Sequence, residues 1–140
     1  MNIDFANLNL AYQEHKHSFD TAIEKVVSSS SFIMGEEVYD LEKNLSNFTG
    51  AKHAISCSDG TDALLLAMMA LGIKPGDEVI TTPFTFIATA ETIAFLGAKP
   101  VFVEINEQTY NIDVIKIEEK ITKKTKAIMP VSLYGQISEM

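Results

Sequence analysis

The loop at residues 56–61 reads SCSDGT and carries three hydroxyl groups and a glycine. We predict that it joins a strand to a helix, whose first turn offers free N–H groups and a positive dipole end that suit a phosphate. Gly60 would let a phosphate approach the backbone closely, and Ser58 and Thr61 have hydroxyls that could donate to it. The alternative is an ordinary tight turn in which Asp59 or Thr61 caps the helix. The loop alone leaves both interpretations open.

A second loop, at residues 81–86, reads TTPFTF and also follows a predicted strand. The ring of Phe84 or Phe86 could stack on a planar heterocycle there. For a single aromatic residue, a place in the core beneath the following helix is the more common role. The standard nucleotide signatures GxGxxG and GxxxxGK[ST] are absent. The three histidines lack metal-ligand spacing, so no metal site is predicted.

The overall composition narrows the classes of function. The chain has 140 residues, 46% hydrophobic and 21% charged, which predicts a globular domain. A net charge of −8 argues against binding to nucleic acid or to an anionic membrane. All 11 basic residues are lysines, so the bidentate carboxylate clamp that arginine provides is absent from the sequence. Cys57 is the only cysteine, and the first ten residues do not resemble a signal peptide, which predicts a cytoplasmic protein.

The elements that must position these loops follow from hydrophobic periodicity. Two helices are predicted before residue 50, and the second, at 36–48, has an apolar face that we expect to be buried. A short buried strand is predicted at 53–57. Beyond it, helices are predicted at 61–71, 85–96 and 113–121, and strands at 78–82, 100–105 and 127–131. This alternation predicts an α/β fold with a mostly parallel sheet and helices on both faces. Ligands of such sheets bind at the carboxyl ends of the strands, where loops 56–61, 81–86, 104–110 and 132–136 are expected.

Six segments, taken in order, resemble the DegT/StrS-type nucleotide-sugar aminotransferases, which are enzymes of fold type I that depend on pyridoxal 5′-phosphate (PLP). The segments read FIMGEEV (32–38), SCSDGTDAL (56–64), PGDEVI (75–80), FTFIAT (84–89), GAKPV (97–101) and PVSLYG (130–135). Within the family, the chain is most similar to the members that install a 3-amino group on a UDP-linked 3-keto-uronic acid. The resemblance implies an N-terminal helical segment at 1–50 and, at 51–140, the first part of a fold type I PLP-transferase large domain.

The resemblance also assigns roles to individual residues. Gly60 and Thr61 match the cofactor-phosphate contacts of the family, and Phe86 matches the aromatic residue that stacks on the pyridine ring. Ser30 and Phe32 match a segment that approaches the sugar substrate, although Ser30 stands where relatives have glycine. No lysine of this sequence lies in a motif like that of the lysine that forms the Schiff base with PLP. No catalytic residue is therefore assigned, and that lysine is expected beyond residue 140.

The function implied for the parent protein is transfer of an amino group from glutamate to a UDP-linked keto-sugar, in the biosynthesis of sugars for cell-surface polysaccharides. The resemblance further implies PLP as the cofactor and a homodimer as the assembly. The chain by itself is expected to be inactive. Two alternatives remain: a PLP-dependent sugar dehydratase of the same family, in which histidine replaces the lysine, and a truncated product without catalytic activity.

Overall fold

The computed structural model of the chain describes residues 6–139. The chain divides into two compact units, with the boundary between Ser56 and Cys57. Each unit is described by itself below.

The first unit contains two helices, α1 (Leu8–Ser29) and α2 (Glu36–Thr49). The side chain of Asn7 caps α1 by accepting a hydrogen bond from the Leu10 N–H at 2.9 Å. Both helices were predicted, but the expected burial of the apolar face at 36–48 is wrong, since neither helix contains a buried residue. Phe48, for example, is 88% exposed. An apolar stripe is buried only when a second layer covers it, and residues 6–56 supply none.

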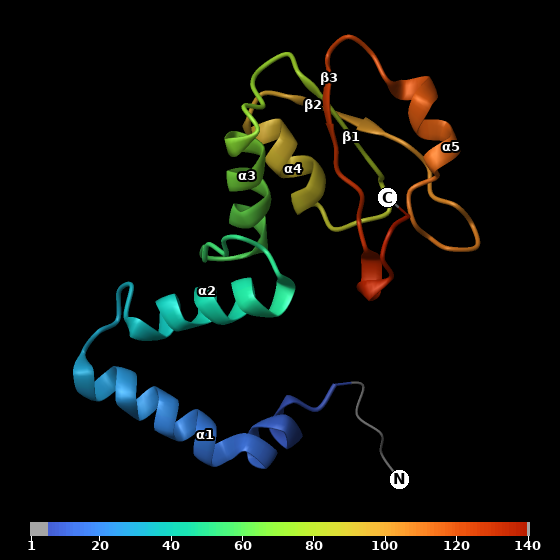
Figure 1. Ribbon diagram of the computed structural model, residues 1–140. Coiled ribbons are helices and arrows are strands. Elements are labelled where there is room, and N and C mark those ends of the chain that lie inside the picture. Colours follow the sequence, from blue (N-terminus) through green and yellow to red (C-terminus); the bar gives the residue numbers. More distant parts are fainter. Residues whose placement is uncertain (1–5, 140) are drawn as a thin grey trace. The chain divides into compact units, whose positions relative to one another are not determined.

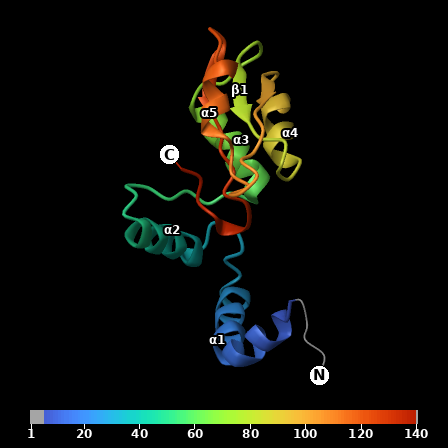
Figure 2. The same ribbon diagram turned by 90° about the vertical axis from the view of Figure 1, so that its right-hand side faces the viewer.

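The second unit is built on a parallel sheet with the strand order β2-β1-β3. Its strands are β1 (Glu78–Thr81), β2 (Lys99–Phe102) and β3 (Thr125–Ile128). Its helices are α3 (Gly60–Ala70), α4 (Ala88–Phe95) and the short α5 (Val114–Ile117), which continues as a 3₁₀ turn at Glu118–Lys120; a second 3₁₀ turn follows at Leu133–Gly135. Helices α3 and α4 lie on one side of the sheet and α5 on the other (Figures 1 and 2). The predicted fold class is confirmed.

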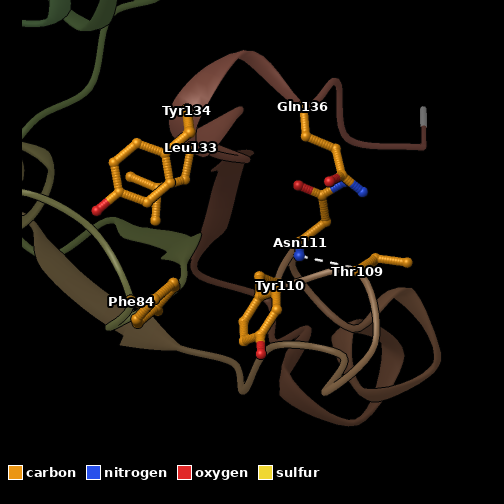
Figure 3. A pocket seen from close by; sticks show the side chains of 7 residues that line it. All are labelled: Phe84, Thr109, Tyr110, Asn111, Leu133, Tyr134 and Gln136. Atoms are coloured by element: carbon orange, nitrogen blue, oxygen red, sulfur yellow. Dashed lines mark hydrogen bonds between the residues drawn. The ribbon is translucent and has the colours of Figure 1, made fainter. Parts of the chain in front are cut away.

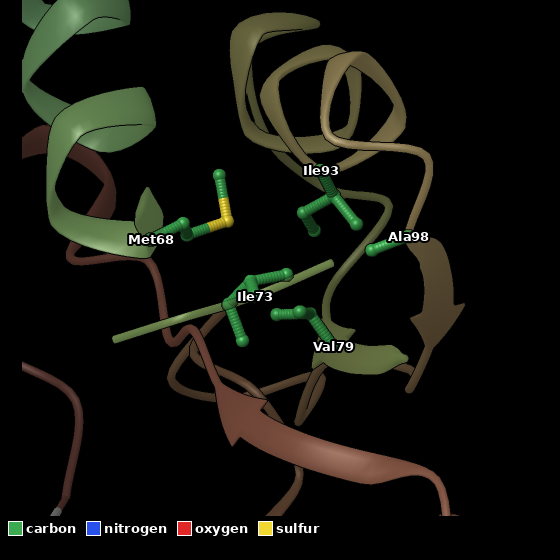
Figure 4. Close-up of a cluster of buried hydrophobic side chains, with 5 residues drawn as sticks. All are labelled: Met68, Ile73, Val79, Ile93 and Ala98. Carbon is green, nitrogen blue, oxygen red and sulfur yellow. The ribbon is translucent and has the colours of Figure 1, made fainter. Parts of the chain in front are cut away.

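The central strand β1 separates two apolar clusters, because successive side chains of a strand point to opposite faces. Val79 packs with Met68, Ile73, Ile93 and Ala98 on the face covered by α3 and α4 (Figure 4). On the other face, the next residue, Ile80, packs with Val103 and Ile112, and Ile117 of α5 joins them. Both Val79 and Ile80 are fully buried. The adjacent apolar residues Val79 and Ile80 thus face opposite sides of a strand that is covered on both faces.

The strand predicted at residues 53–57 does not form. These residues have no regular secondary structure, and Ile55 is 83% exposed. A strand is stabilised by hydrogen bonds to a neighbouring strand, and none of the three strands found in residues 6–139 pairs with this segment. The apolar pattern at 53–57 was therefore misread, because a sequence pattern does not reveal whether a partner strand is present.

Glu78 links the three strands at the end of the sheet opposite to the predicted ligand loops. Its carboxylate accepts a hydrogen bond from Thr122 Oγ1 at 2.6 Å, and Lys99 Nζ lies 3.6 Å away. Thr122 lies just before β3 and Lys99 begins β2. The hydrogen bond from Thr122, with Lys99 and Lys124 nearby, lowers the pKa of Glu78 below its ordinary value.

We expect Glu78→Gln to lower the thermal midpoint of unfolding at pH 7. The variant lacks a carboxylate whose ionised form is favoured more by the folded state than by the unfolded state. Because the pKa of Glu78 is lower in the folded state, its ionised carboxylate stabilises the fold at pH values above the ordinary carboxyl pKa. This contribution is lost as the pH falls through the folded-state pKa. The difference in thermal midpoint between wild type and variant should therefore shrink as the pH is lowered below about 4. The exposed Glu118→Gln is the control. A difference independent of pH would contradict the prediction.

Candidate functional site

The N-terminus of α3 has hydrogen-bond donors that no other group among the described residues uses. Asp59 caps the helix, with its Oδ1 accepting from the Asp62 N–H at 2.9 Å. Within residues 6–139, no acceptor takes the N–H of Gly60 or of Thr61, and the Thr61 hydroxyl has no partner. Three donors therefore converge on one helix end, as a phosphate requires.

The two hydroxyls proposed as donors from the sequence differ in the structure. Ser58 Oγ donates to the carboxylate of Asp62, so its single proton is already engaged. The Thr61 hydroxyl has no partner in the part of the chain that the structure describes. A Cβ placed on Gly60 would meet no atom of the protein within 4 Å, so the fold itself does not require glycine there. The cap interpretation is correct for Asp59, and it leaves the phosphate interpretation of Gly60 and Thr61 intact.

The loop between β1 and α4 presents aromatic rings to solvent. Phe86 is 71% exposed and Phe84 is 43% exposed, so the interpretation of either as a core residue is wrong. The loop is itself well fixed: Thr82 Oγ1 accepts from the Phe84 N–H at 3.2 Å, and the Phe86 carbonyl accepts from the Thr89 N–H at 3.2 Å. An exposed ring on a loop whose backbone is fixed is available to stack on a ligand. The N-termini of α3 and α4 lie at the same edge of the second unit, where β1 and β3 end (Figure 1).

A cavity of about 280 Å³ lies at this carboxyl edge (Figure 3). It is lined by three segments that each follow a different strand, and the side chains are Phe84, Thr109, Tyr110, Asn111, Leu133, Tyr134 and Gln136. The rings of Phe84 and Tyr110 are 5.9 Å apart between centroids. The loops at 81–86, 104–110 and 132–136 were expected at this edge, and the parallel topology brings them together.

Two tyrosines of this cavity have left-handed backbone conformations that L-residues adopt at a cost of about 1–2 kcal/mol. Tyr110 has a φ of 59° and Tyr134 a φ of 54°. The sequence predicts the loops but singles out neither tyrosine, nor Asn111 beside them. Backbone strain of this kind leaves no pattern in the hydrophobic periodicity, and the only available signal was the position of each loop after a strand.

Ser30 and Phe32 lie in the first unit, in the turn between α1 and α2. Ser30 ends α1 with a φ of 54°, and its N–H donates to the Val27 carbonyl at 3.2 Å. Phe32 is 67% exposed and borders an apolar groove together with Ile23 and Val27 of α1. Both residues are accessible, as a segment that approaches a substrate must be.

We expect Ser30→Gly to stabilise the first unit, because glycine adopts the left-handed conformation without the cost of about 1 kcal/mol that serine has. Urea unfolding followed by circular dichroism measures this effect. Ser31→Gly is the matched control: Ser31 is not among the residues with positive φ, so there the added flexibility of glycine should destabilise the chain slightly. Equal effects of the two substitutions would contradict the prediction.

Residues 6–139 contain no group of three or more His, Cys, Asp or Glu side chains arranged to hold a metal ion. Within the same residues, no helix has the length and apolar character needed to cross a membrane.

Comparison with known proteins identifies similar sequences and structures. Residues 13–140 match the sequence profile of the DegT/DnrJ/EryC1/StrS aminotransferase family. The chain is 52% identical to the UDP-2-acetamido-2-deoxy-3-oxo-D-glucuronate aminotransferase of Pseudomonas aeruginosa, over 98% of this chain and 38% of that protein. The solved structure of Streptomyces venezuelae DesV in complex with a ketimine intermediate superposes with a TM-score of 0.95 at 37% identity, covering 98% of this chain and 37% of that one. NtdA from Bacillus subtilis with bound cofactor PMP gives a TM-score of 0.87 at 39% identity, covering 90% and 29%.

Proposed function

The chain belongs to the DegT/DnrJ/EryC1/StrS aminotransferase family, and on this basis we propose that it forms the cofactor-phosphate part of the active site of a nucleotide-sugar aminotransferase. The observation that carries the proposal is the set of free donors at Gly60 and Thr61, at the edge of the sheet that also presents Phe86. The chain spans 38% of the length of the P. aeruginosa relative, so the activity belongs to a longer protein.

In this proposal the cofactor is PLP, and the residues present fit its phosphate. The N–H groups of Gly60 and Thr61 and the Thr61 hydroxyl bind the phosphate oxygens, with the positive end of the α3 dipole behind them. Phe86 packs its exposed ring on the pyridine ring and limits the access of water to that face. When bound, PLP supplies an electron sink for amino-group transfer, a chemistry that no side chain provides.

We further propose the reactants and the setting of the parent enzyme. The acceptor is a UDP-linked keto-sugar, supported by the activity named for the P. aeruginosa relative, and the amino donor is glutamate. Ser30 and Phe32 contact the sugar nucleotide. The N-terminal helical segment at 1–50 and the partial PLP-binding domain at 51–140 act within a cytoplasmic homodimer that makes sugars for cell-surface polysaccharides.

The chain itself should bind the cofactor without catalysing transfer, because none of its lysines is assigned to form the Schiff base. We expect pyridoxamine 5′-phosphate, which does not react with lysine, to bind the chain with measurable affinity in a calorimetric titration. With PLP and glutamate, no turnover of a UDP-linked keto-sugar should follow. Absence of pyridoxamine 5′-phosphate binding would contradict the proposed cofactor site. Turnover by the 140-residue chain would contradict the claim that none of its lysines forms the Schiff base.

The coding sequence beyond codon 140 separates this proposal from its alternatives. A lysine at the Schiff-base position of the family supports the aminotransferase. A histidine there supports the sugar dehydratase, and a stop codon supports a product without catalytic activity.

A further inference from the structure

The segment after β3 is held at the carboxyl edge by few interactions. Tyr134 is 98% exposed, so packing does not fix its backbone. The local hydrogen bonds are those of the 3₁₀ turn, from the Gly135 N–H to the Ser132 carbonyl at 3.1 Å and from the Gln136 N–H to the Leu133 carbonyl at 3.2 Å. A short turn with an unfavourable backbone conformation requires additional anchoring to remain in one conformation.

Side chains provide that anchoring at the end of the segment. Asn111 Nδ2 donates to the Ile137 carbonyl at 3.0 Å across 26 residues of sequence, and Asn111 is only 9% exposed. Ser138 Oγ donates to the Val131 carbonyl at 3.2 Å and closes the base of the segment. Asn111 thus supplies the long-range bond that ties residues 132–138 to a different loop of the sheet edge.

Asn111 is itself rigidly placed. Its neighbour Ile112 is 5% exposed and belongs to the apolar cluster around Ile80. The Asn111 carbonyl accepts from the Asn106 N–H at 2.8 Å, and the Tyr110 N–H donates to the Asn106 carbonyl at 2.8 Å. A side chain beside a core residue, with its backbone hydrogen-bonded, can act as a fixed point for a weaker segment.

We propose that Asn111 is a positioning residue of the carboxyl-edge site: by fixing the Ile137 carbonyl, it holds Leu133, Tyr134 and Gln136 around the cavity opposite Phe84. The inference rests on the proposed function, because the cavity adjoins the loop that carries Phe86. Asn111 does not touch the phosphate-binding donors of α3. Asn111 therefore influences the binding of the cofactor ring and leaves the binding of a phosphate group unaffected.

The first test measures hydrogen exchange at residues 132–138 and needs no ligand. Asn111→Leu keeps the size of the side chain and removes the donor. The amides of Gly135 and Gln136 should then exchange about fivefold faster, as expected for the loss of one neutral hydrogen bond. Exchange at β1 should be unchanged. Unchanged exchange at 132–138 in a folded variant would overturn the proposal.

A second variant, Asn111→Asp, covers the case in which Asn111→Leu does not fold. The ionised carboxylate cannot donate to the Ile137 carbonyl, whereas the protonated acid can. Exchange at 132–138, expressed relative to wild type at each pH, should be fast at pH 7 and return towards wild type below about pH 4. Asp113 and Glu139 lie around the same polar cavity as Asn111 and are present in both proteins, so each pH is compared with wild type at that same pH. A ratio that does not change with pH would overturn the proposal.

A third measurement separates positioning from general damage to the fold. The affinity of Asn111→Leu for pyridoxamine 5′-phosphate should fall about fivefold, whereas its affinity for inorganic phosphate should be unchanged. An equal loss for both ligands would overturn the positioning role. If the wild-type chain binds neither ligand, the proposed cofactor site fails, and the exchange measurements alone decide whether Asn111 fixes the segment.

Discussion

Gly97→Ala is expected to destabilise the chain by about 3 kcal/mol, from a backbone cost of about 1–2 kcal/mol and a steric cost of about 1–3 kcal/mol. Gly97 connects α4 to β2 with a φ of 70°, which disfavours any residue with a Cβ. The added Cβ would also lie 2.9 Å from Pro75 Cγ, closer than van der Waals contact allows. Urea unfolding of the variant measures the sum of both costs.

Gly72→Ala separates the two costs. Gly72 follows α3 with a φ of 72°, but a Cβ there would meet nothing within 4 Å. This control should lose about 1–2 kcal/mol from the backbone alone. Pro75→Ala removes the Cγ with which the new Cβ of Gly97→Ala would clash. The double variant Gly97→Ala/Pro75→Ala should therefore recover part of the stability that Gly97→Ala loses. Equal losses in the two glycine variants would contradict the steric contribution.

Gly60→Ala is expected to weaken the binding of inorganic phosphate and of pyridoxamine 5′-phosphate by about tenfold or more, while leaving the fold intact. The new methyl group would stand among the donors that receive the phosphate oxygens, and lost hydrogen bonds to a charged group are worth about 1.5–3 kcal/mol each. Within the protein the Cβ has open space, and alanine in place of glycine in a helix adds about 0.5–1 kcal/mol of stability. Binding and stability should therefore change in opposite directions.

The two hydroxyls of the loop provide a matched pair for the same site. Thr61→Val removes a free hydroxyl and should weaken phosphate binding by about tenfold. Ser58→Ala removes a hydroxyl that already donates to Asp62, so phosphate binding should change little. Calorimetric titration with both ligands measures the affinities. A larger loss in Ser58→Ala than in Thr61→Val would contradict the assignment of donors.

Much of the second unit could be predicted from the sequence, because its signals are local. The alternation of helices with strands predicted a parallel sheet covered on both faces. Gly72, which follows α3, has the left-handed φ that a residue just past a helix end commonly adopts. Local patterns failed at 53–57, where strand formation depends on a partner that the pattern does not contain. They failed again at α2, where burial depends on a second layer.

For the candidate site, the sequence determined that loops 81–86, 104–110 and 132–136 lie at the carboxyl edge, since each follows a strand of the parallel sheet. Loop 56–61 was expected to follow a strand that does not form. The sequence also identified Gly60 and Thr61 as possible phosphate ligands. Only the tertiary structure decided that Ser58 is engaged by Asp62 while Thr61 is free, and that Phe86 is exposed. The tertiary structure also brought Asn111 to the Ile137 carbonyl. The physical reason is that hydrogen-bond partners and burial depend on residues far apart in the chain, whereas periodicity and turn composition depend on neighbours.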